Sequence, residues 1–274
     1  MDPRDIRKVL TVEVQDELLL VAAGFPIHEI GEALEKLSRY FEAIGICYFL
    51  ESADAEKFRT SLIRSAHGRR FFLRKSKEQG TGGDRRMALS RTEAILHAVA
   101  AGHLLLAGEI ADLSVDQWEP TWEYEDDFCY FQFLHHVIRR PDLIGGRESL
   151  ALIRRLEAAL QGAPSNRLRL ANSLVQRNET WFNDVLVRLM EEQQILLEQR
   201  KEKLLEPDAE AYVHWPRTYV STEGLALILI GQTIGLKAQE EVPLCPVDVR
   251  LPVSNIDCED FFQGIEAVLE RGGP

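Results

Sequence analysis

The sequence predicts an all-α fold, and three observations support this prediction. Proline is absent between Pro26 and Pro120 and again between Pro164 and Pro207, and such stretches permit helices because proline removes a helical hydrogen bond. Apolar residues inside them recur every three or four positions, which is the helical period. The segment 242–253 alternates in part, but its three prolines favour an extended loop or an edge. We therefore expect about ten helices built from αα-hairpins, with little or no sheet.

Apolar spacing and turn signals predict the helices of the first half. A single apolar face runs from residue 30 to residue 44 and consists of Ile30, Ala33, Leu34, Leu37, Tyr40, Phe41 and Ile44. Ser90 and Glu93 have the spacing of a capping box before an apolar run. Between Ser90 and Ser114 the pattern predicts two short helices that are broken at Gly102–His103.

The second half continues in the same way. A helical face recurs over Phe128, Phe131, Leu134 and Ile138. A helix over 148–161 is expected to end at Gly162, because Pro164 follows it. The stretch 166–205 is the longest helical candidate and is interpreted as one element.

Two caps predict the last helices. Ser221 can cap a helix that ends at Gly235. Asp257 can cap a final helix that carries Phe261, Phe262, Ile265, Val268 and Leu269.

Length limits the domain organisation. A chain of 274 residues suits one large domain or two small ones. Repeats with a period of about 34 or 40 residues are not seen, so a regular solenoid is not supported. The segment 162–166 (GAPSN) is the best internal seam, but it is too short to establish two domains. We expect a single helical domain over 1–274.

Composition and charge exclude several classes of protein. Asp and Glu total 44 against 32 Lys and Arg, which gives a net charge of −12. This negative charge argues against general nucleic-acid binding and against attachment to anionic membranes, because both surfaces carry phosphates. Uncharged runs such as 94–108 and 225–235 are shorter than the roughly 20 apolar residues that span a bilayer. The N-terminus lacks an apolar signal region, and the four cysteines lack metal or disulfide spacing. A cytoplasmic location with reduced thiols is the expectation.

Charge is unevenly distributed along the chain. Residues 64–91 contain nine Lys and Arg and two acids, whereas residues 109–127 contain eight acids and no base. Residues 237–270 contain eight acids and two bases. These blocks either pair with each other inside the fold or form an acidic surface that binds a basic partner.

The motifs of common enzyme classes are absent from the sequence. It contains no phosphate-binding loop, zinc-protease motif or nucleophile elbow. Asp127 with His135 or His136 is the one combination that suggests a divalent-metal hydrolase. Asp127 and His135 are eight residues apart, or roughly 12 Å along a helix, so they cannot bind one ion without a ligand from elsewhere. From the sequence we therefore expect neither a metal site nor a cofactor.

Aromatic residues alternate with the acids of 109–127. Trp118, Trp122 and Tyr124 either hold the start of the next helix against the core or act as contacts with a partner.

Two stretches resemble a known family. The run AILHAVAAGHLLLAGEIADLSVDQWEPTWEYEDDFCYFQFLHHVI (94–138) resembles the immunity protein 49 family of bacterial polymorphic toxin systems, with a short helix, a small-residue turn, a second helix, a tryptophan and YEDDFCYFQFLHHVI. The segment YVSTEGLALILIGQTIGLKAQEEVPL (219–244) is similar to the C-terminal helix of that family. These stretches cover about a quarter of the chain.

The resemblance implies an immunity protein that is not an enzyme and needs no cofactor. Such a protein binds a cognate toxin in the cytoplasm and occludes its active site or the surface through which substrate reaches it. The net charge suits a basic toxin, such as one that acts on nucleic acid. The oligomeric state stays open. The residues expected to contact the toxin are Glu119, Trp122, Glu123, Glu125, Asp126, Glu240 and Glu241.

Two other functions remain as alternatives from the residues alone. One is the metal-dependent hydrolase that uses Asp127 with His135 or His136. The other is a helical scaffold or regulator that docks through the basic block 64–91.

Overall fold

The fold is all-α, as the sequence predicts. The computed structural model describes residues 1–80, 83–91, 93–203, 209–250, 252, 260 and 262–265. These residues form eleven α-helices and four short 3-10 helices, with no strand among them. The α-helices are α1 (Pro3–Ala22), α2 (Ile27–Ser52), α3 (Ala55–Glu78), α4 (Glu93–Ala100), α5 (Leu104–Leu113), α6 (Glu125–Arg139), α7 (Arg147–Leu160), α8 (Asn166–Val175), α9 (Glu179–Lys203), α10 (Ala209–Arg217) and α11 (Thr222–Thr233).

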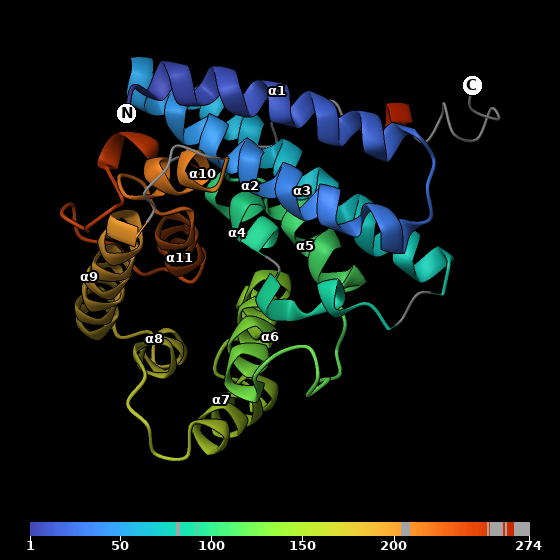
Figure 1. Cartoon of the computed structure of the whole chain (residues 1–274). Helices are drawn as coiled ribbons and strands as arrows, with labels where there is room; N and C mark the ends of the chain where they lie inside the picture. The colour runs from blue at the N-terminus through green and yellow to red at the C-terminus, as the bar shows by residue number, and fades with distance from the viewer. Residues whose placement is uncertain are drawn as a thin grey trace.

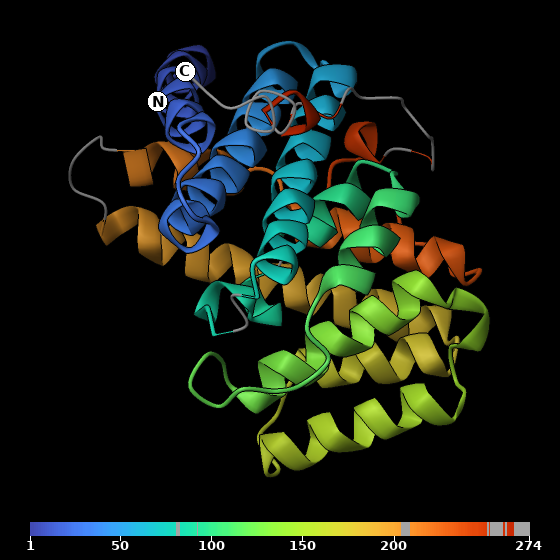
Figure 2. The same ribbon diagram turned by 90° about the vertical axis from the view of Figure 1, so that its right-hand side faces the viewer.

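The three N-terminal helices form one layer. Helices α1, α2 and α3 are the longest of the first half, and each packs along the next, with α4 and α5 beneath α3 (Figure 1). Helices α6 and α7 pair with each other, as do α8 and α9, and Figure 2 shows α6, α7 and α8 on the side of the molecule away from α1. Helix α11 returns to pack against α4, which joins the C-terminal part of the chain to its first half.

Local signals explain where several helices begin. Asp2 and Asp54 accept hydrogen bonds from the backbone N–H groups of Arg4 and Lys57, so they cap α1 and α3. The predicted break in 90–114 is confirmed: Gly102 has a φ of +78°, and His103 caps α5 through its Nδ1. Glycine tolerates this left-handed conformation because it has no Cβ.

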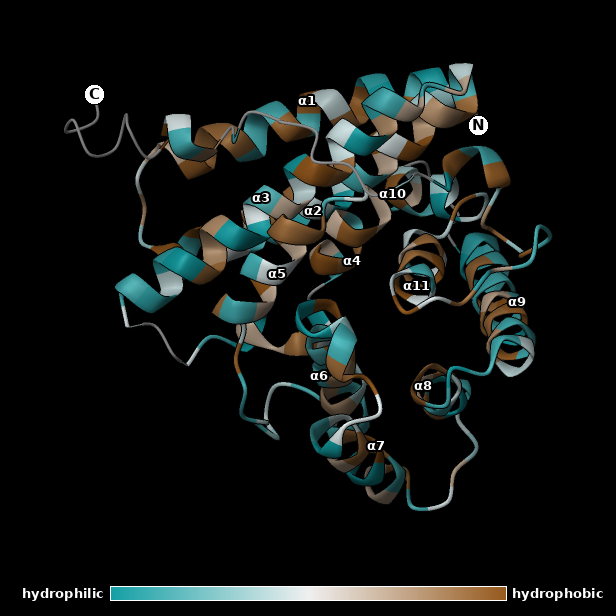
Figure 3. Cartoon of the chain, turned by 180° about the vertical axis from the view of Figure 1, so that it is seen from behind, coloured by the Kyte–Doolittle hydropathy of each residue, from teal (hydrophilic) through white to brown (hydrophobic). Residues whose placement is uncertain are grey.

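Helix α11 is the most deeply buried helix of the second half. Every residue from Thr222 to Gly231 is buried except Glu223, and Figure 3 shows this helix mostly in the hydrophobic colour between α9 and α4. A helix that is apolar all round is a core helix. The predicted Ser221 cap is confirmed by its hydrogen bond with the N–H of Gly224.

The interpretation of 166–205 as one element is wrong. The chain turns at 176–178, where Arg177 has a φ of +49° and Asn178 accepts a hydrogen bond from the N–H of Trp181. Asn178 is therefore the cap of a second helix, α9, and cap residues of this type begin helices more often than they continue them.

The capping box at Ser90 and Glu93 is also wrong. Ser90 lies inside a 3-10 helix, η2 (Leu89–Arg91), and its N–H donates to Glu123. The Glu93 carboxylate instead accepts from Arg217. A charged partner from a distant helix has replaced the local bond that the spacing predicts.

The helix over 148–161 and the final helix have different outcomes. Helix α7 ends at Leu160, and the left-handed Gln161 and Gly162 follow it, as expected. Asp257, Phe261, Val268 and Leu269 lie outside the described residues. Phe262 and Ile265 are buried, and the ring of Phe262 lies 5.4 Å from that of Phe71.

None of the described helices is long and apolar enough to cross a membrane.

Candidate functional site

A cleft lies where the two halves of the chain meet. It has a volume of about 480 Å³ and is lined by residues of α2, η2, α4, α6, α8, α9, α10 and α11. Polar side chains dominate the lining, and five carboxylates and three guanidiniums face it: Glu42, Glu93, Glu123, Asp127, Glu223, Arg91, Arg167 and Arg217. Burying charged side chains costs free energy unless they are paired. The partners of these eight groups therefore decide which of them can bind a ligand.

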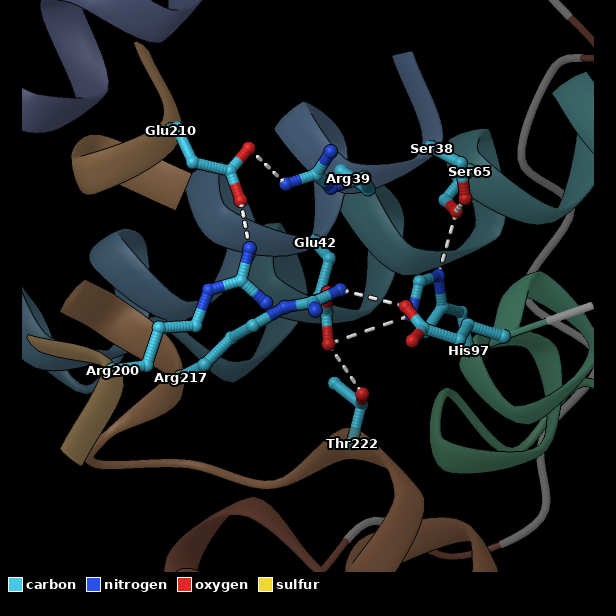
Figure 4. Close-up of polar contacts among 10 residues, drawn as sticks. Ser38, Arg39, Glu42, Ser65, His97, Arg200, Glu210, Arg217 and Thr222 are labelled. Carbon is cyan, nitrogen blue, oxygen red and sulfur yellow. Dashed lines mark hydrogen bonds and ion pairs between the residues drawn. The ribbon is translucent and has the colours of Figure 1, made fainter. Parts of the chain in front are cut away.

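Glu42 forms the floor of the cleft. It lies in the middle of α2, and only 3% of it is exposed. Arg217, the last residue of α10, donates to Oε2 of Glu42 from Nε at 2.7 Å and also from Nη2. Thr222, the first residue of α11, donates to the other carboxylate oxygen. Figure 4 shows these side chains converging on the Glu42 carboxylate from three helices.

The charges of the floor shift each other's pKa values. Burial by itself would raise the pKa of Glu42, but the positive charge of Arg217 and the contacts with His97 and Thr222 hold that pKa well below its ordinary value. Burial opposes the charged form of Arg217 in the same way, and Glu42 and Glu93 raise its pKa above the ordinary value. Both groups are therefore ionised at neutral pH.

A chain of polar contacts continues from the floor into the core. His97 lies with Nε2 3.4 Å from Oε1 of Glu42, its Nδ1 is 2.6 Å from the Ser65 hydroxyl, and Ser65 contacts Ser38 at 2.7 Å. The group Ser65–His97–Glu42 has the residue types of a hydrolase triad. A nucleophile must reach its substrate, however, and only 1% of Ser65 is exposed. The chain of contacts is therefore a structural network.

The floor also contains the three residues that come closest to a metal site. Glu42, Glu93 and His97 place one ligand atom each within 4.8 Å of the others. Arg217 already donates to both carboxylates, so a guanidinium supplies the positive charge that a cation would bring. These residues do not fit a resident metal ion, because an ion there would have to displace the Arg217 guanidinium, which already donates to both carboxylates.

The wall of the cleft is built from α6, α8 and the start of α11. Arg167 donates to Asp127 at 2.6 Å, and its guanidinium lies over the rings of Tyr130 and Phe131. Glu223 lies in the first turn of α11 and interacts electrostatically with Arg167. The Oε1 of Glu223 is buried and has no donor within ordinary hydrogen-bond limits among the described residues, and the Tyr130 hydroxyl is close enough to lower the pKa of the carboxyl. Burial raises the pKa of Glu223, Arg167 opposes this shift, and Glu93 adds to it.

A second cleft of about 770 Å³ joins the first at Ser90, Arg91, Glu93 and Arg217. Arginines dominate its lining, but they share nearby carboxylates. Arg39 and Arg200 both donate to Glu210, as Figure 4 shows, and Arg91 donates to Glu35. Carboxylates of the same chain thus neutralise much of the positive charge that lines this second cleft.

Most acids of the block 109–127 have internal partners. Four carboxylates pair with arginines: Glu109 with Arg70, Asp112 with Arg139, Glu125 with Arg155, and Asp127 with Arg167. Arg70 comes from the basic block 64–91 and also binds Asp260. The other three arginines lie outside that block, so the acidic segment is largely paired inside the fold, but only in small part with the basic block 64–91.

The predicted contact residues before α6 differ in their environments. Glu123 is buried, and its carboxylate accepts the N–H groups of Leu89 and Ser90, so it stabilises η2. Glu119 accepts both the N–H and the hydroxyl of Thr121. Trp122 is half-buried against the core and lines the cleft, whereas Asp126 has no ion pair with a described residue.

Glu240 and Glu241 lie elsewhere. Both are exposed in the segment after α11. Figures 1 and 2 place that segment beyond α9 and α11, on the side away from the connection between α5 and α6 that carries Glu119 and Glu123. The predicted contact set is thus divided between two surfaces.

The structure does not bring Asp127 together with His135 or His136. Asp127 faces the cleft and binds Arg167. His135 is 2% exposed, and burial with the charge of Arg139 lowers its pKa to about 3. His136 faces Glu148 in a separate hollow beside α5. The helical period separates these side chains, so the metal-hydrolase alternative has no site at these residues.

The sequence singled out part of the cleft lining, namely Trp122, Glu123, Tyr124 and Asp127, but not Glu42, Glu223 or their arginine partners. Glu42 and Glu223 each interrupt an otherwise apolar stretch, YFEAIGI and TEGLALILIG. A single carboxylate in a buried helix needs a partner, and that signal was available. The arginines that face these carboxylates, Arg217 for Glu42 and Arg167 for Glu223, could not be assigned from the sequence, because they come from helices distant in the chain.

Comparison with known proteins identifies a family. The family model described as "Immunity protein 49" matches residues 50–248, which is most of the chain. That range contains the cleft residues except Glu42. No curated protein and no solved structure matches.

Proposed function

Because the chain belongs to the immunity protein 49 family, we propose that it binds a cognate bacterial toxin and neutralises it. The family match over residues 50–248 carries this proposal. Neutralisation follows from occlusion: the bound protein covers the active site of the toxin, or the surface through which substrate reaches it. The role is non-enzymatic and takes place in the cytoplasm.

Charge supports a basic partner. The net charge of −12 attracts a basic toxin over long range and raises the rate of association. A toxin that acts on nucleic acid has such a basic surface, because it must bind phosphates. This complementarity makes a basic, nucleic-acid-targeting enzyme the toxin class that we propose.

The acids with internal partners are poor candidates for direct contacts. Glu123 holds η2, and Glu125 binds Arg155, so replacing either one would disturb the fold. Within the predicted set, Glu119, Trp122 and Asp126 on one side and Glu240 and Glu241 on the other remain the contacts that we propose. Only one of these two surfaces needs to touch the toxin, because they face different directions.

Co-expression tests the function. The reading frame adjacent to the gene for this chain is induced in a sensitive host, with and without the chain, and the two products are then co-purified. Growth that is restored together with a stable complex is the expected result. Toxicity that persists despite folded chain, or a neighbour without toxicity, would contradict the proposal.

Charge reversal then separates the two surfaces. Glu119→Lys with Asp126→Lys forms one variant, and Glu240→Lys with Glu241→Lys forms the other. We expect one variant to weaken the complex and the other to bind like the wild type. Wild-type binding by both at physiological salt would remove the acidic surfaces from the proposal.

A further inference from the structure

We propose that the cleft receives a lysine or arginine side chain of the toxin, which Glu223 and Tyr124 hold together. This inference rests on the proposed function and specifies its central contact. Glu223 lies in the wall of the cleft and was not among the contacts expected from the sequence. Tyr124 lies at the rim and was one of the aromatic residues considered as contacts with a partner.

The balance of charge in the cleft favours a cation. Five carboxylates and three guanidiniums line it, and each guanidinium already has an acceptor. Arg217 binds Glu42 and Glu93, and Arg167 binds Asp127. Arg91 donates to Glu35, which does not line this cleft. The cleft thus has more acceptors than donors, and a ligand that donates hydrogen bonds and carries positive charge complements it.

Glu223 is the cleft carboxylate whose Oε1 has no donor among the described residues within ordinary hydrogen-bond limits, although the Tyr130 phenol lies close enough to lower the pKa of this carboxyl. That oxygen is buried, and an unsatisfied buried polar atom is unusual in a folded protein. Arg167 is the cation that faces it, but the Nη1 of Arg167 donates to Asp127. Glu93, Asp127 and the Tyr130 phenol are the other groups near it. An incoming ammonium or guanidinium group would supply the missing donor.

Tyr124 is the exposed aromatic residue at the rim. It immediately precedes α6, lines the cleft, and is 79% exposed. An aromatic ring of this kind can pack on the aliphatic stem of a lysine or arginine, and its face attracts the cation. Tyrosine is enriched among the residues that dominate binding energy. Trp122 lines the same cleft and adds a second aromatic surface beside Tyr124.

The dimensions are compatible with an inserted side chain. The cleft volume of about 480 Å³ lies within the range of roughly 300–1,000 Å³ that small ligands occupy. This volume holds one long side chain with neighbouring backbone or water. Because the floor is fixed by the Glu42–Arg217 pair, the cleft is formed before the partner arrives.

The test uses two variants and two matched controls with the purified toxin domain from the co-expression experiment. Glu223→Gln keeps the size of the side chain and removes its charge, and Tyr124→Ala removes the rim. Glu198→Gln removes an exposed carboxylate of α9, and Tyr219→Ala removes another exposed tyrosine. Thermal unfolding of every variant establishes that it is folded. We expect each cleft variant to reduce affinity by at least about tenfold, and each control by less than about twofold.

The pH dependence gives a second readout. Binding a cation favours the carboxylate form of Glu223, so the wild-type affinity rises with pH as this group loses its proton. In Glu223→Gln the part of the pH dependence that comes from this carboxyl should be absent, while the part that comes from other ionisable groups should remain. A dependence that is unchanged in Glu223→Gln would contradict the role of this residue.

The outcomes distinguish this inference from the proposed function. If the wild type protects cells and binds the toxin, but both cleft variants bind as tightly, the function stands and the cleft inference is wrong. Loss of affinity in Tyr124→Ala alone would show an aromatic contact without a cation, and would also overturn the inference. If the folded wild type neither binds nor protects, the proposed function fails first.

Discussion

Arg217 donates from Nε to Oε2 of Glu42 across 2.7 Å, and the two residues are 175 positions apart in the chain. The same guanidinium reaches Glu93 on α4, and the same carboxylate accepts from Thr222 on α11. One buried ion pair therefore joins four helices at the point where the two halves of the chain meet. Because removal of either member leaves a desolvated charge, this pair fixes the positions of the helices around the cleft.

Glu42→Gln is expected to destabilise the protein by about 3–5 kcal/mol, because it leaves Arg217 buried with one carboxylate fewer. Urea unfolding at pH 7 measures the loss. Glu198→Gln, which disrupts only an exposed pair with Lys201, is the control and should cost less than about 1 kcal/mol. A loss for Glu42→Gln as small as the control would mean that the pair does not hold the helices.

His135 is expected to make the protein sensitive to mild acid. Burial lowers its pKa from 6.5 to about 3, so between these values the unfolded chain binds a proton that the folded chain does not. Stability therefore falls as pH decreases below about 6.5, with a slope of up to about 1.4 kcal/mol per pH unit from this residue. Urea unfolding at pH 7.5, 6.5 and 5.5 would measure the slope.

His135→Leu is the variant that assigns this effect. Without an imidazole at position 135 the slope between pH 7.5 and 5.5 should decrease. His28→Leu removes an exposed imidazole and should leave the slope unchanged. Equal slopes in the wild type and His135→Leu would show that another group causes the acid sensitivity.

Glu123→Gln is expected to cost about 1.5–3 kcal/mol in stability, because the carboxylate accepts two backbone N–H groups of η2. Asp126→Asn lies three residues away without an ion pair to a described residue, so its cost should be within about 0.5 kcal/mol. Thermal or urea unfolding compares the two variants. If both are neutral, the Glu123 carboxylate does not stabilise η2.

Two glycine substitutions test the packing of the helices around the cleft. A Cβ at Gly224 in α11 would collide with the sulfur atoms of Cys245 and Met190, whereas a Cβ at Gly108 in α5 would meet nothing within 4 Å. Gly224→Ala should therefore destabilise by about 1–3 kcal/mol. Gly108→Ala should stabilise by about 0.5–1 kcal/mol, because alanine is the better helix former. Unfolding midpoints that move in the same direction would contradict this assignment.

The sequence predicted helices and caps correctly where local interactions decide the structure. The break at Gly102–His103, the Ser221 cap and the end of α7 depend on residues within a few positions of each other. The interpretation of 166–205 failed at Asn178, where a cap residue within a helical pattern begins a second helix. The capping box failed because Glu93 binds Arg217 instead.

The sequence by itself determined the helical class, the acidic character and the family resemblance, because composition, periodicity and motif text are properties of the chain. Only the tertiary structure decided which charges are paired and which are available. Glu123 and Glu125 look like surface acids in the sequence, yet they hold the fold, whereas Glu223 lies in an apolar helix and faces the cleft. Electrostatic partners are set by distance in space, and Glu42 acquires Arg217 only when α2 and α10 pack together.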